Sequence, residues 1–322
     1  MSIQIAIADA PRLGQLDFNY ERSLLKDYDA ELSIHNCNTK EEILGELKDK
    51  DIICLVSSIF NAEIINELTK CKAIMRYGIG VDMIDIEAAT QRGILVCNEP
   101  HYSVDDVALH TVTMILALTK KVCLLDKEIR RGNWGFQKGY TVNRLTDKTV
   151  GMIGFGHIAR RVKELLAPFG VKYLVYDPFL SAVAAENSGV TLVSTLEELL
   201  GNSDFVSIHC PLTNETRHFI GKEQFNKMKP NAFIINTSRG PIINQKDLVQ
   251  ALEDKKIRGA GLDVYEEEPL KSTDPLCQFD NVILTPHSAF YSEESVLQLR
   301  TSIMNQVISV IKGEKPIYLI NK

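Results

Sequence analysis

Short apolar runs alternate with amphipathic stretches along most of this chain, and this alternation limits the possible fold more than any other feature. The runs have the length of buried strands, and the stretches carry apolar residues at helical spacing. Strands that alternate with helices form parallel sheets. The pattern therefore predicts an α/β protein. Strands are expected at 3–8, 52–56, 73–76, 149–153, 173–176, 205–209, 233–236, 259–263 and 282–284, and helices at 41–48, 158–169, 196–200, 246–254 and, as one sustained helix capped by Ser103, 104–126.

Composition narrows the class of protein. A chain of 322 residues that is 45% hydrophobic and 24% charged can build two domains with cores of their own. Its net charge of −6 has no basic block, which argues against nucleic acid and an anionic membrane as partners. The N-terminus has no signal-peptide pattern, and no apolar run reaches the length of a membrane helix. We therefore expect a cytoplasmic protein.

Seven cysteines are scattered without a CxxC pair or a His/Cys cluster at metal-ligand spacing. This distribution favours buried or incidental thiols in a reducing compartment. No metal site is expected.

A glycine fingerprint lies where a predicted strand meets a predicted helix. In its core, Gly154-x-Gly156-x-x-Ala159, the first glycine permits a tight turn and the second lets the backbone approach a pyrophosphate. The small Ala159 lets the helix pack on the strand, and the helix N-terminus faces the phosphates. Such glycine turns also occur in α/β folds for packing reasons alone, so the fingerprint needs support from its surroundings.

Asp177 supplies that support. It ends the next predicted strand, about 20 residues beyond the glycines, where a carboxylate accepts hydrogen bonds from an adenosine ribose. A carboxylate repels a 2′-phosphate, and no arginine follows immediately, which favours NAD over NADP. The alternative is that Asp177-Pro178 forms a simple turn at the end of the strand.

Three isolated residues in the C-terminal half are the components of an alcohol/ketone redox site. Arg239 can fork a carboxylate, His287 can move a proton, and Glu268 can pair with that histidine. Each residue also has a plainer interpretation. Arg239-Gly240 suits a turn with a surface ion pair, and a histidine after Pro286 suits a loop. The three residues indicate chemistry only as a set, with the fingerprint supplying the hydride carrier.

Several further segments match a known family. They are 76–82, 149–160, 209–213, 228–232, 236–240, 263–269 and 285–287. With them the chain resembles the D-isomer-specific 2-hydroxyacid dehydrogenase family over essentially its full length. Segments 97–98, 103–106 and 286–295 look most like its C-terminal-binding-protein branch, which includes bacterial dehydrogenases and animal transcriptional co-repressors.

The resemblance implies two Rossmann-like domains with parallel sheets, one flavodoxin-like and one dinucleotide-binding, with an active-site cleft between them. It implies a substrate-binding domain over 1–100 and 287–322 and an NAD-binding domain over 101–286. It also implies a homodimer formed through the nucleotide domain. The small-molecule partner would be a 2-hydroxy or 2-keto acid.

The resemblance also assigns residues. Arg239 matches the arginine that binds the substrate's carboxylate and carbonyl oxygen, His287 the acid/base, and Glu268 its paired carboxylate, whereas the neighbouring Glu266 and Glu267 are expected in a solvated turn. The substrate carboxylate would also be bound by backbone donors of Tyr77, Gly78, Ile79 and Gly80. Cofactor contacts are implied for Thr111, Gly154, Gly156, His157, Ile158, Asp177, Cys210, Pro211, Thr216, Thr237, Ser238 and, near the nicotinamide amide, Asp263.

Three departures from the family limit what can be carried over. Pro241 stands where a second glycine is common, so the local turn is expected to differ. Phe290 stands where the co-repressor branch has a tryptophan, which changes the pocket. Segment 56–60 lacks an arginine suited to a substrate phosphate, which counts mildly against phosphoglycerate oxidation.

Trp134 is expected to pack against other residues rather than to recognise substrate.

The sequence thus predicts an NAD-dependent oxidoreductase that interconverts a D-2-hydroxy acid and the 2-keto acid. Two alternatives stay open: an NAD(H)-sensing, co-repressor-like binding protein, and a phosphoglycerate dehydrogenase.

Overall fold

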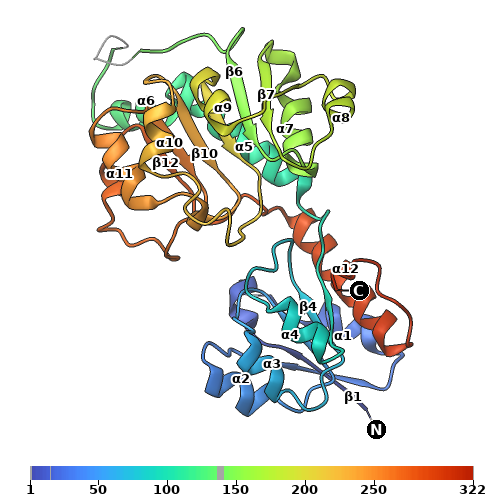
Figure 1. Cartoon of the computed structure of the whole chain (residues 1–322). Coiled ribbons are helices and arrows are strands. Elements are labelled where there is room, and N and C mark those ends of the chain that lie inside the picture. Colours follow the sequence, from blue (N-terminus) through green and yellow to red (C-terminus); the bar gives the residue numbers. More distant parts are fainter. Residues whose placement is uncertain (1, 15, 136–140, 322) are drawn as a thin grey trace. The chain divides into compact units, whose positions relative to one another are not determined.

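The computed structural model describes residues 2–14, 16–135 and 141–321. It divides into two compact units, coloured along the chain in Figure 1. Unit 1 comprises Met1–Tyr102 and Ser292–Lys322, and unit 2 comprises Ser103–Tyr291. The sequence predicted domain boundaries at 100/101 and 286/287. Because unit 2 of the structure ends at Tyr291, His287 falls in the same unit as Arg239 and Glu268.

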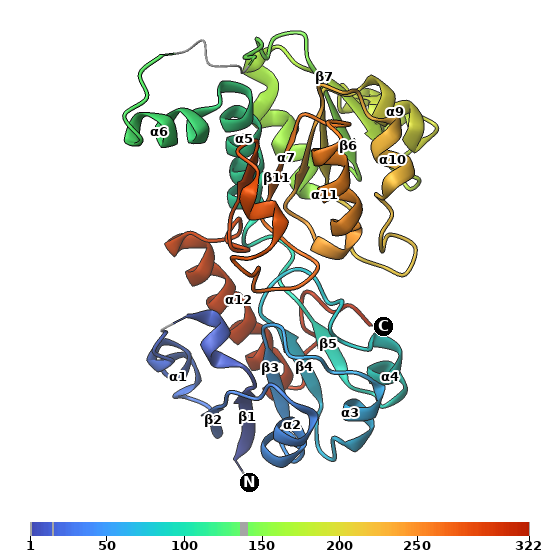
Figure 2. The same cartoon turned by 90° about the vertical axis from the view of Figure 1, so that its left-hand side faces the viewer.

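Unit 1 contains a five-stranded parallel sheet in the order β2-β1-β3-β4-β5. Its helices cover both faces: α1 packs with α12 on one face, and α2, α3 and α4 pack in a row on the other (Figure 2). The elements are β1 (Ile3–Ile7), α1 (Asn19–Leu25), β2 (Ala30–Ile34), α2 (Lys40–Leu47), β3 (Ile52–Leu55), α3 (Ala62–Glu67), β4 (Ala73–Arg76), α4 (Ile86–Gln91), β5 (Leu95–Cys97) and α12 (Glu293–Ile311).

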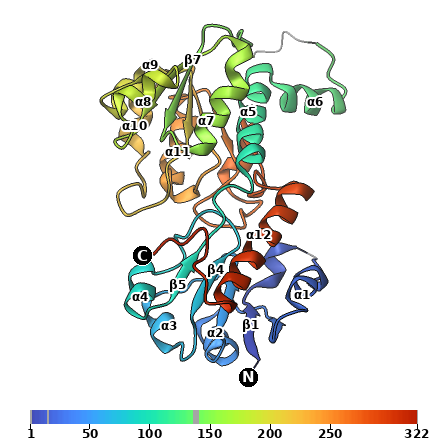
Figure 3. The same cartoon turned by 90° about the vertical axis from the view of Figure 1, so that its right-hand side faces the viewer.

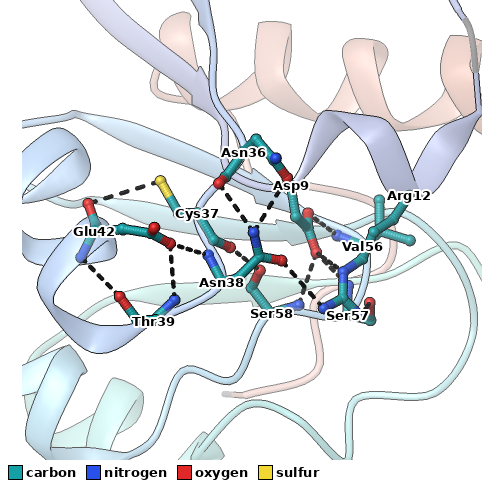
Figure 4. A network of polar contacts seen from close by, with 10 residues as sticks. All are labelled: Asp9, Arg12, Asn36, Cys37, Asn38, Thr39, Glu42, Val56, Ser57 and Ser58. Atoms are coloured by element: carbon teal, nitrogen blue, oxygen red, sulfur yellow. Dashed lines mark hydrogen bonds and ion pairs between the residues drawn. The ribbon is translucent and has the colours of Figure 1, made fainter. Parts of the chain in front are cut away.

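A buried carboxylate organises the carboxyl edge of this sheet. Asp9, just after β1, accepts three backbone N–H groups from Val56, Ser57 and Ser58, each at 2.7 Å (Figure 4). These bonds satisfy donors that the end of β3 would otherwise leave unpaired in the interior. The loop after β3 is therefore fixed from the end of β1.

Unit 2 contains a seven-stranded parallel sheet in the order β12-β11-β10-β9-β6-β7-β8. The chain adds β7 and β8 on one side of β6, then returns to add β9 to β12 on the other. In such sheets ligands bind beyond the carboxyl ends of the strands where the order reverses, which here lies between β6 and β9. The strands are β6 (Thr149–Ile153), β7 (Lys172–Tyr176), β8 (Thr191–Leu192), β9 (Phe205–Ile208), β10 (Phe233–Asn236), β11 (Gly259–Leu262) and β12 (Val282–Leu284).

Helices cover both faces of this sheet as well. α5 and α7 pack against each other on one face, and α9, α10 and α11 form a row on the other (Figure 3). The buried residues of α5, such as Ile115 and Leu118, join Val150 and Ile235 of the strands in one core cluster. The helices are α5 (Val104–Lys120), α6 (Val122–Arg130), α7 (His157–Leu166), α8 (Ala182–Asn187), α9 (Leu196–Asn202), α10 (Lys222–Lys227) and α11 (Gln245–Glu253).

The expectation of one sustained helix over 104–126 is wrong. Lys121 adopts a left-handed conformation, with φ of 58°, and α5 and α6 meet there at 59°. Lysine rarely ends a helix in this way, and the apolar pattern continues past it, so periodicity does not reveal the break. Ser103 does occupy the N-cap position of α5, but its side chain makes no capping hydrogen bond. Within the described residues no single helix is long and apolar enough to cross a membrane.

The nine expected strands are all present, with ends shifted by one residue at most. Three further strands were not expected: β2, β5 and β8. β8 has two residues and β5 three, and β2 is an edge strand without a fully buried residue. Strands this short or this exposed lack the apolar run on which the expectation rested.

Candidate active site

The catalytic and cofactor residues expected in unit 2 gather at one place, the carboxyl edge of its sheet. Except for Thr111 on α5, they lie in the segments that follow β6, β7, β9, β10, β11 and β12. Hydrogen bonds tie these segments to one another. The fingerprint lies after β6, and His287 lies after β12 at the other side of this edge.

The fingerprint forms the turn between β6 and α7. Gly154 has φ of 87°, and a Cβ there would lie 3.0 Å from the backbone of His209 and Cys210. A side chain is therefore excluded both by the conformation and by the neighbouring loop. Gly156 is the N-cap of α7 and a Cβ there meets no atom within 4 Å, so the helix N-terminus is open on that side. Ala159 is fully buried against the sheet.

The Asp177 carboxylate reaches back to the fingerprint. Its Oδ2 accepts the Phe155 N–H at 2.9 Å and its Oδ1 accepts the Phe179 N–H at 2.9 Å. The bond from Phe179 forms the turn at the end of the strand that was considered as the plainer alternative. The bond from Phe155 places the carboxylate beside the glycines. One residue therefore forms the turn and presents a negative charge at the fingerprint.

Hydroxyl groups connect the loops after β9 and β10. The Ser238 hydroxyl donates to the Cys210 carbonyl oxygen at 2.5 Å, and the Thr216 hydroxyl donates to the Pro211 carbonyl oxygen at 2.7 Å. The Thr237 and Thr111 hydroxyls lie 2.9 Å apart, which links the loop to α5. These six expected cofactor residues thus belong to one connected group. His157 and Ile158 lie in the first turn of α7.

Arg239 is fixed by the tight approach of Gly240 to the next loop. A Cβ on Gly240 would lie 1.9 Å from the Tyr265 carbonyl, so no side chain fits. The Arg239 carbonyl oxygen accepts the Asn236 amide at 2.9 Å, and Pro241 falls in the first turn of a 3-10 helix, where its missing N–H costs nothing. Pro241 is thus compatible with the local turn.

Glu268 and His287 form a close pair. Glu268 Oε2 lies 2.7 Å from His287 Nδ1, and Oε1 accepts the Tyr265 N–H at 3.0 Å. Burial raises the pKa of Glu268, but the hydrogen bond and charge of His287, with the nearby charge of Arg239, outweigh it and hold that pKa below its usual value. The two side chains are 35% and 39% exposed, so small molecules can reach the pair.

Asp263 holds the loop that carries His287. Its buried carboxylate accepts the Ser288 and Ala289 N–H groups, each at 2.9 Å, and the Thr285 hydroxyl at 2.5 Å. The His287 N–H donates to the Asp263 carbonyl oxygen at 2.7 Å, which stabilises a histidine whose φ is 53°. The expected contact of Asp263 with the nicotinamide amide stays a prediction. What these bonds do is position His287.

Sequence reasoning did not assign site roles to His110, Thr285 and Tyr265. His110 Nε2 lies 3.0 Å from the Thr285 hydroxyl, which continues the network from Asp263 to α5. The Tyr265 hydroxyl donates to the Thr285 carbonyl oxygen at 2.9 Å. Tyr265 and Thr285 lie inside segments 263–269 and 285–287, which match the family, and this match was the one sequence signal that could have pointed to them.

One of the plainer expectations fits the structure and another is wrong. Glu266 is exposed, as expected for a solvated turn, and its carboxylate lies 2.5 Å from Nε2 of the exposed His218. Trp134 does not pack within its unit: it is 89% exposed, because it follows α6, which itself buries no residue. Glu267, paired on the surface with Lys271, fits the expectation of a solvated turn.

The expected substrate residues of unit 1 follow β4. The Tyr77 side chain is buried and the Gly78 N–H already donates to the Arg76 carbonyl oxygen at 2.9 Å. Gly78 has φ of 137°, and a Cβ there would collide with the Arg76 guanidinium. The Ile79 carbonyl oxygen accepts the Asn98 amide at 2.6 Å. Binding of a substrate carboxylate by Tyr77, Gly78, Ile79 and Gly80 stays a prediction.

The Arg12 side chain reaches segment 56–60, the loop after β3, which contains no arginine of its own. Arg12 Nη1 donates to the Ser57 hydroxyl at 2.6 Å, and its Nε lies 4.0 Å from Asp9 (Figure 4). Arg12 is distant from Ser57 along the chain, so inspection of segment 56–60 could not detect it.

Comparison with known proteins decides the family. The sequence model described as "D-isomer specific 2-hydroxyacid dehydrogenase, NAD binding domain" matches residues 112–289. The chain belongs to this family. It is therefore an oxidoreductase of 2-hydroxy acids that works with a nicotinamide dinucleotide. The matched residues include the carboxyl-edge network except His110 and Thr111, which lie just before the match.

Relatives named for different activities support the same class of enzyme. A D-3-phosphoglycerate dehydrogenase of Methanocaldococcus jannaschii is 41% identical over 88% of this chain, and a glyoxylate reductase of Thermofilum pendens is 40% identical over 88%. A crystal structure of D-lactate dehydrogenase from Aquifex aeolicus, complexed with NAD and lactic acid, has a TM-score of 0.90 at 30% identity, with 99% of both chains covered.

These relatives differ in length. The chain spans 54% of the phosphoglycerate dehydrogenase and 85% of the glyoxylate reductase. The C-terminal-binding-protein branch stays a prediction.

Proposed function

We propose that the chain is an NAD-dependent D-2-hydroxyacid dehydrogenase, with Arg239, Glu268 and His287 in the roles expected from sequence. The observation that carries this proposal is the 2.7 Å contact of His287 Nδ1 with Glu268, beside the charge of Arg239. With Nδ1 occupied by the carboxylate, Nε2 is the nitrogen left to exchange a proton with substrate.

The residues perform three tasks in the reaction. The Arg239 guanidinium binds the substrate carboxylate through paired N–H donors, which a lysine cannot reproduce. His287 donates a proton to the keto oxygen during reduction and removes it from the hydroxyl during oxidation. Glu268 stabilises the charged imidazolium and fixes its ring. When bound, the dinucleotide supplies or accepts the hydride.

The residues at the carboxyl edge fit that cofactor. Gly154 and Gly156 leave the backbone at the start of α7 free of side chains, and the helix N-terminus favours a pyrophosphate. The Asp177 carboxylate beside Phe155 would accept ribose hydroxyls and repel a 2′-phosphate. These contacts support NAD rather than NADP.

A panel of 2-keto acids tests the proposal. We expect NADH absorbance to fall with at least one of glyoxylate, pyruvate and longer keto acids, and NADPH to be the poorer donor. Asp177→Ser should narrow the difference between the two cofactors. If no acid is reduced although NADH binds, the dehydrogenase proposal fails and the NAD(H)-sensing alternative takes its place.

A second candidate, oxidation of a phosphorylated hydroxy acid, rests on Arg12. The Arg12 guanidinium donates to Ser57, so it supplies a cation to segment 56–60, which has no arginine of its own. A phosphoglycerate dehydrogenase is also among the relatives. We expect this candidate, if correct, to show higher kcat/KM with 3-phosphoglycerate than with lactate, and Arg12→Ala to lower only the former. Equal effects on both substrates would exclude it.

We further propose a homodimer formed through unit 2. Figures 2 and 3 show α6 extending from the end of α5, away from the sheet. Val122 and Ile129 on α6, with Leu109 on α5 and Trp134, are exposed apolar side chains that a second copy would cover. Sedimentation should show a dimer that Ile129→Glu dissociates. A monomeric wild-type protein would contradict the proposal.

A further inference from the structure

A pocket in unit 2 lies at the amino edge of the sheet, where the strands begin. It has a volume of about 320 Å³, and its lining includes Phe205 and Phe233, the first residues of β9 and β10. Their rings stack with centroids 5.5 Å apart. None of the residues expected to bind cofactor or substrate lines it.

The charged residues that line this pocket are mostly cations. Arg144, Lys148, Lys229 and Arg258 contribute positive charge, and Asp204 is the one carboxylate within the described lining. Asp204 Oδ1 lies 3.5 Å from Lys229 Nζ and 3.9 Å from Lys148 Nζ, while Oδ2 accepts the Thr149 N–H at 2.9 Å. One carboxylate thus serves two lysines and a backbone donor, which leaves positive charge in excess.

Lys121 is not among the described lining residues, but it places a buried cation at the ring of Phe233, which is. It is 9% exposed, and its ammonium lies 5.3 Å from the centroid of the Phe233 ring. The Arg258 guanidinium carbon lies 5.8 Å from the same centroid. No carboxylate of the described residues pairs with Lys121, and burial followed by the charge of Arg258 lowers its pKa.

The aromatic ring alone does not account for this arrangement. One cation over a ring face is stabilising, but a second cation at the same ring adds repulsion in a partly desolvated place. The C-terminus of α5 supplies only a partial negative charge. Arg258 lines the pocket, and Lys121 lies at the same Phe233 ring, so an anion in the pocket would offset the repulsion between the two cations.

We propose that this pocket, referred to below as the amino-edge pocket, binds a small anion that carries more than one negative charge, of the phosphate-ester or polycarboxylate class. Its volume lies near the lower end of the range for small-molecule pockets, which suits a metabolite of that size. The stacked phenylalanines would contact the apolar part of the ligand. This site lies beyond the proposed dehydrogenase reaction and uses none of its residues.

The experiment compares neighbouring lysines at the end of α5. Lys121→Gln removes the buried cation, whereas Lys120→Gln removes an exposed one, so that the two variants lose the same charge at almost the same place. Pyrophosphate and citrate are titrated by calorimetry into the full chain, with sodium chloride holding ionic strength constant. Thermal unfolding is measured with and without each anion.

We expect pyrophosphate or citrate to bind and raise the melting temperature of wild type and Lys120→Gln alike. Lys121→Gln and Arg258→Gln should bind about tenfold more weakly or not at all. Without anion, Lys121→Gln should melt at the same temperature as wild type or higher, because the repulsion is gone. Preference for pyrophosphate indicates a phosphate ester, and preference for citrate a polycarboxylate.

Three results would overturn the proposal. One is the absence of binding by either anion beyond the effect of sodium chloride. Another is an equal loss in Lys120→Gln, which would reveal non-specific screening. The third is that Lys121→Gln lowers the melting temperature without anion and leaves the anion-induced shift intact, which would make Lys121 a structural partner of Phe233.

Discussion

The two edges of the seven-stranded sheet of unit 2 are built from the same strands but differ in chemistry. At the carboxyl edge, three carboxylates, Asp177, Asp263 and Glu268, accept backbone N–H groups and hold the loops in one network. At the amino edge, several cations surround stacked phenylalanines with one carboxylate in the pocket lining. At the carboxyl edge the carboxylates have hydrogen-bond partners within the unit, which preorganises the loops. At the amino edge the positive charges of the pocket outnumber its carboxylate.

In the comparison of the two edges, the largest effect is expected for Arg239→Ala. Loss of the bidentate partner of the substrate carboxylate should lower kcat/KM by about 10³-fold, and Arg239→Lys should recover only part of it. Lys172→Gln, at the exposed amino end of β7, is the matched control and should stay within about twofold of wild type. Steady-state kinetics check this. An equal loss of kcat/KM in Arg239→Ala and Lys172→Gln would contradict the claim that the carboxyl edge carries the reaction.

Gly240→Ala tests how tightly the carboxyl edge is packed. The added methyl group would overlap the Tyr265 carbonyl, so we expect a loss of about 3 kcal/mol in the free energy of unfolding. Gly45→Ala, in α2 with no atom within 4 Å, should gain about 0.5–1 kcal/mol. Urea denaturation of both variants decides the matter. A Gly240→Ala protein as stable as wild type would show that the loops can separate.

His209 makes the carboxyl edge sensitive to mild acid. Burial lowers the pKa of His209 to about 4, below its unfolded value of about 6.5. The unfolded chain therefore binds the proton first, and stability falls as pH drops from about 6.5 to about 4, by roughly 2–3 kcal/mol at most. His209→Gln should lose this part of the pH dependence. Identical pH profiles in the two proteins would contradict the assignment.

The smallest effect is expected for the pH dependence of Glu268. Its folded pKa is lowered, so its contribution to stability is complete above the unfolded value of about 4.3 and is lost as pH falls through the folded pKa. Denaturation of wild type and Glu268→Gln near pH 6 and pH 3 measures this. The variant should lose less stability between the two pH values, and a larger loss would reverse the sign of the account.

The sequence was sufficient where a signal is local. Buried strands and the fingerprint have patterns of their own, and nine strands could be predicted within a residue at their ends. The break at Lys121 could not be predicted, because neither glycine nor proline marks it. Nor could the loop-holding bonds of Asp263, since they depend on which backbone groups meet its carboxylate.

Contacts between distant residues set the other limit. The amino-edge pocket combines residues from 118 to 258, and four helices and strands of unit 1 separate Arg12 from Ser57 along the chain. No spacing along the chain brings such residues together, because the strand order decides which loops are neighbours. The catalytic trio was found because each member lies in a motif, whereas the positive charges of the pocket, apart from Lys229 in segment 228–232, lie in none.

The most direct test of the central claim is one pair of measurements on His287→Gln. Nicotinamide fluorescence reports NADH binding, and NADH absorbance reports keto-acid reduction in the same sample. Because the fingerprint binds cofactor and His287 moves the proton, we predict NADH affinity within about twofold of wild type and turnover lower by about 10²- to 10⁴-fold. Turnover that stays at the wild-type level would contradict the claim that the carboxyl edge works through His287.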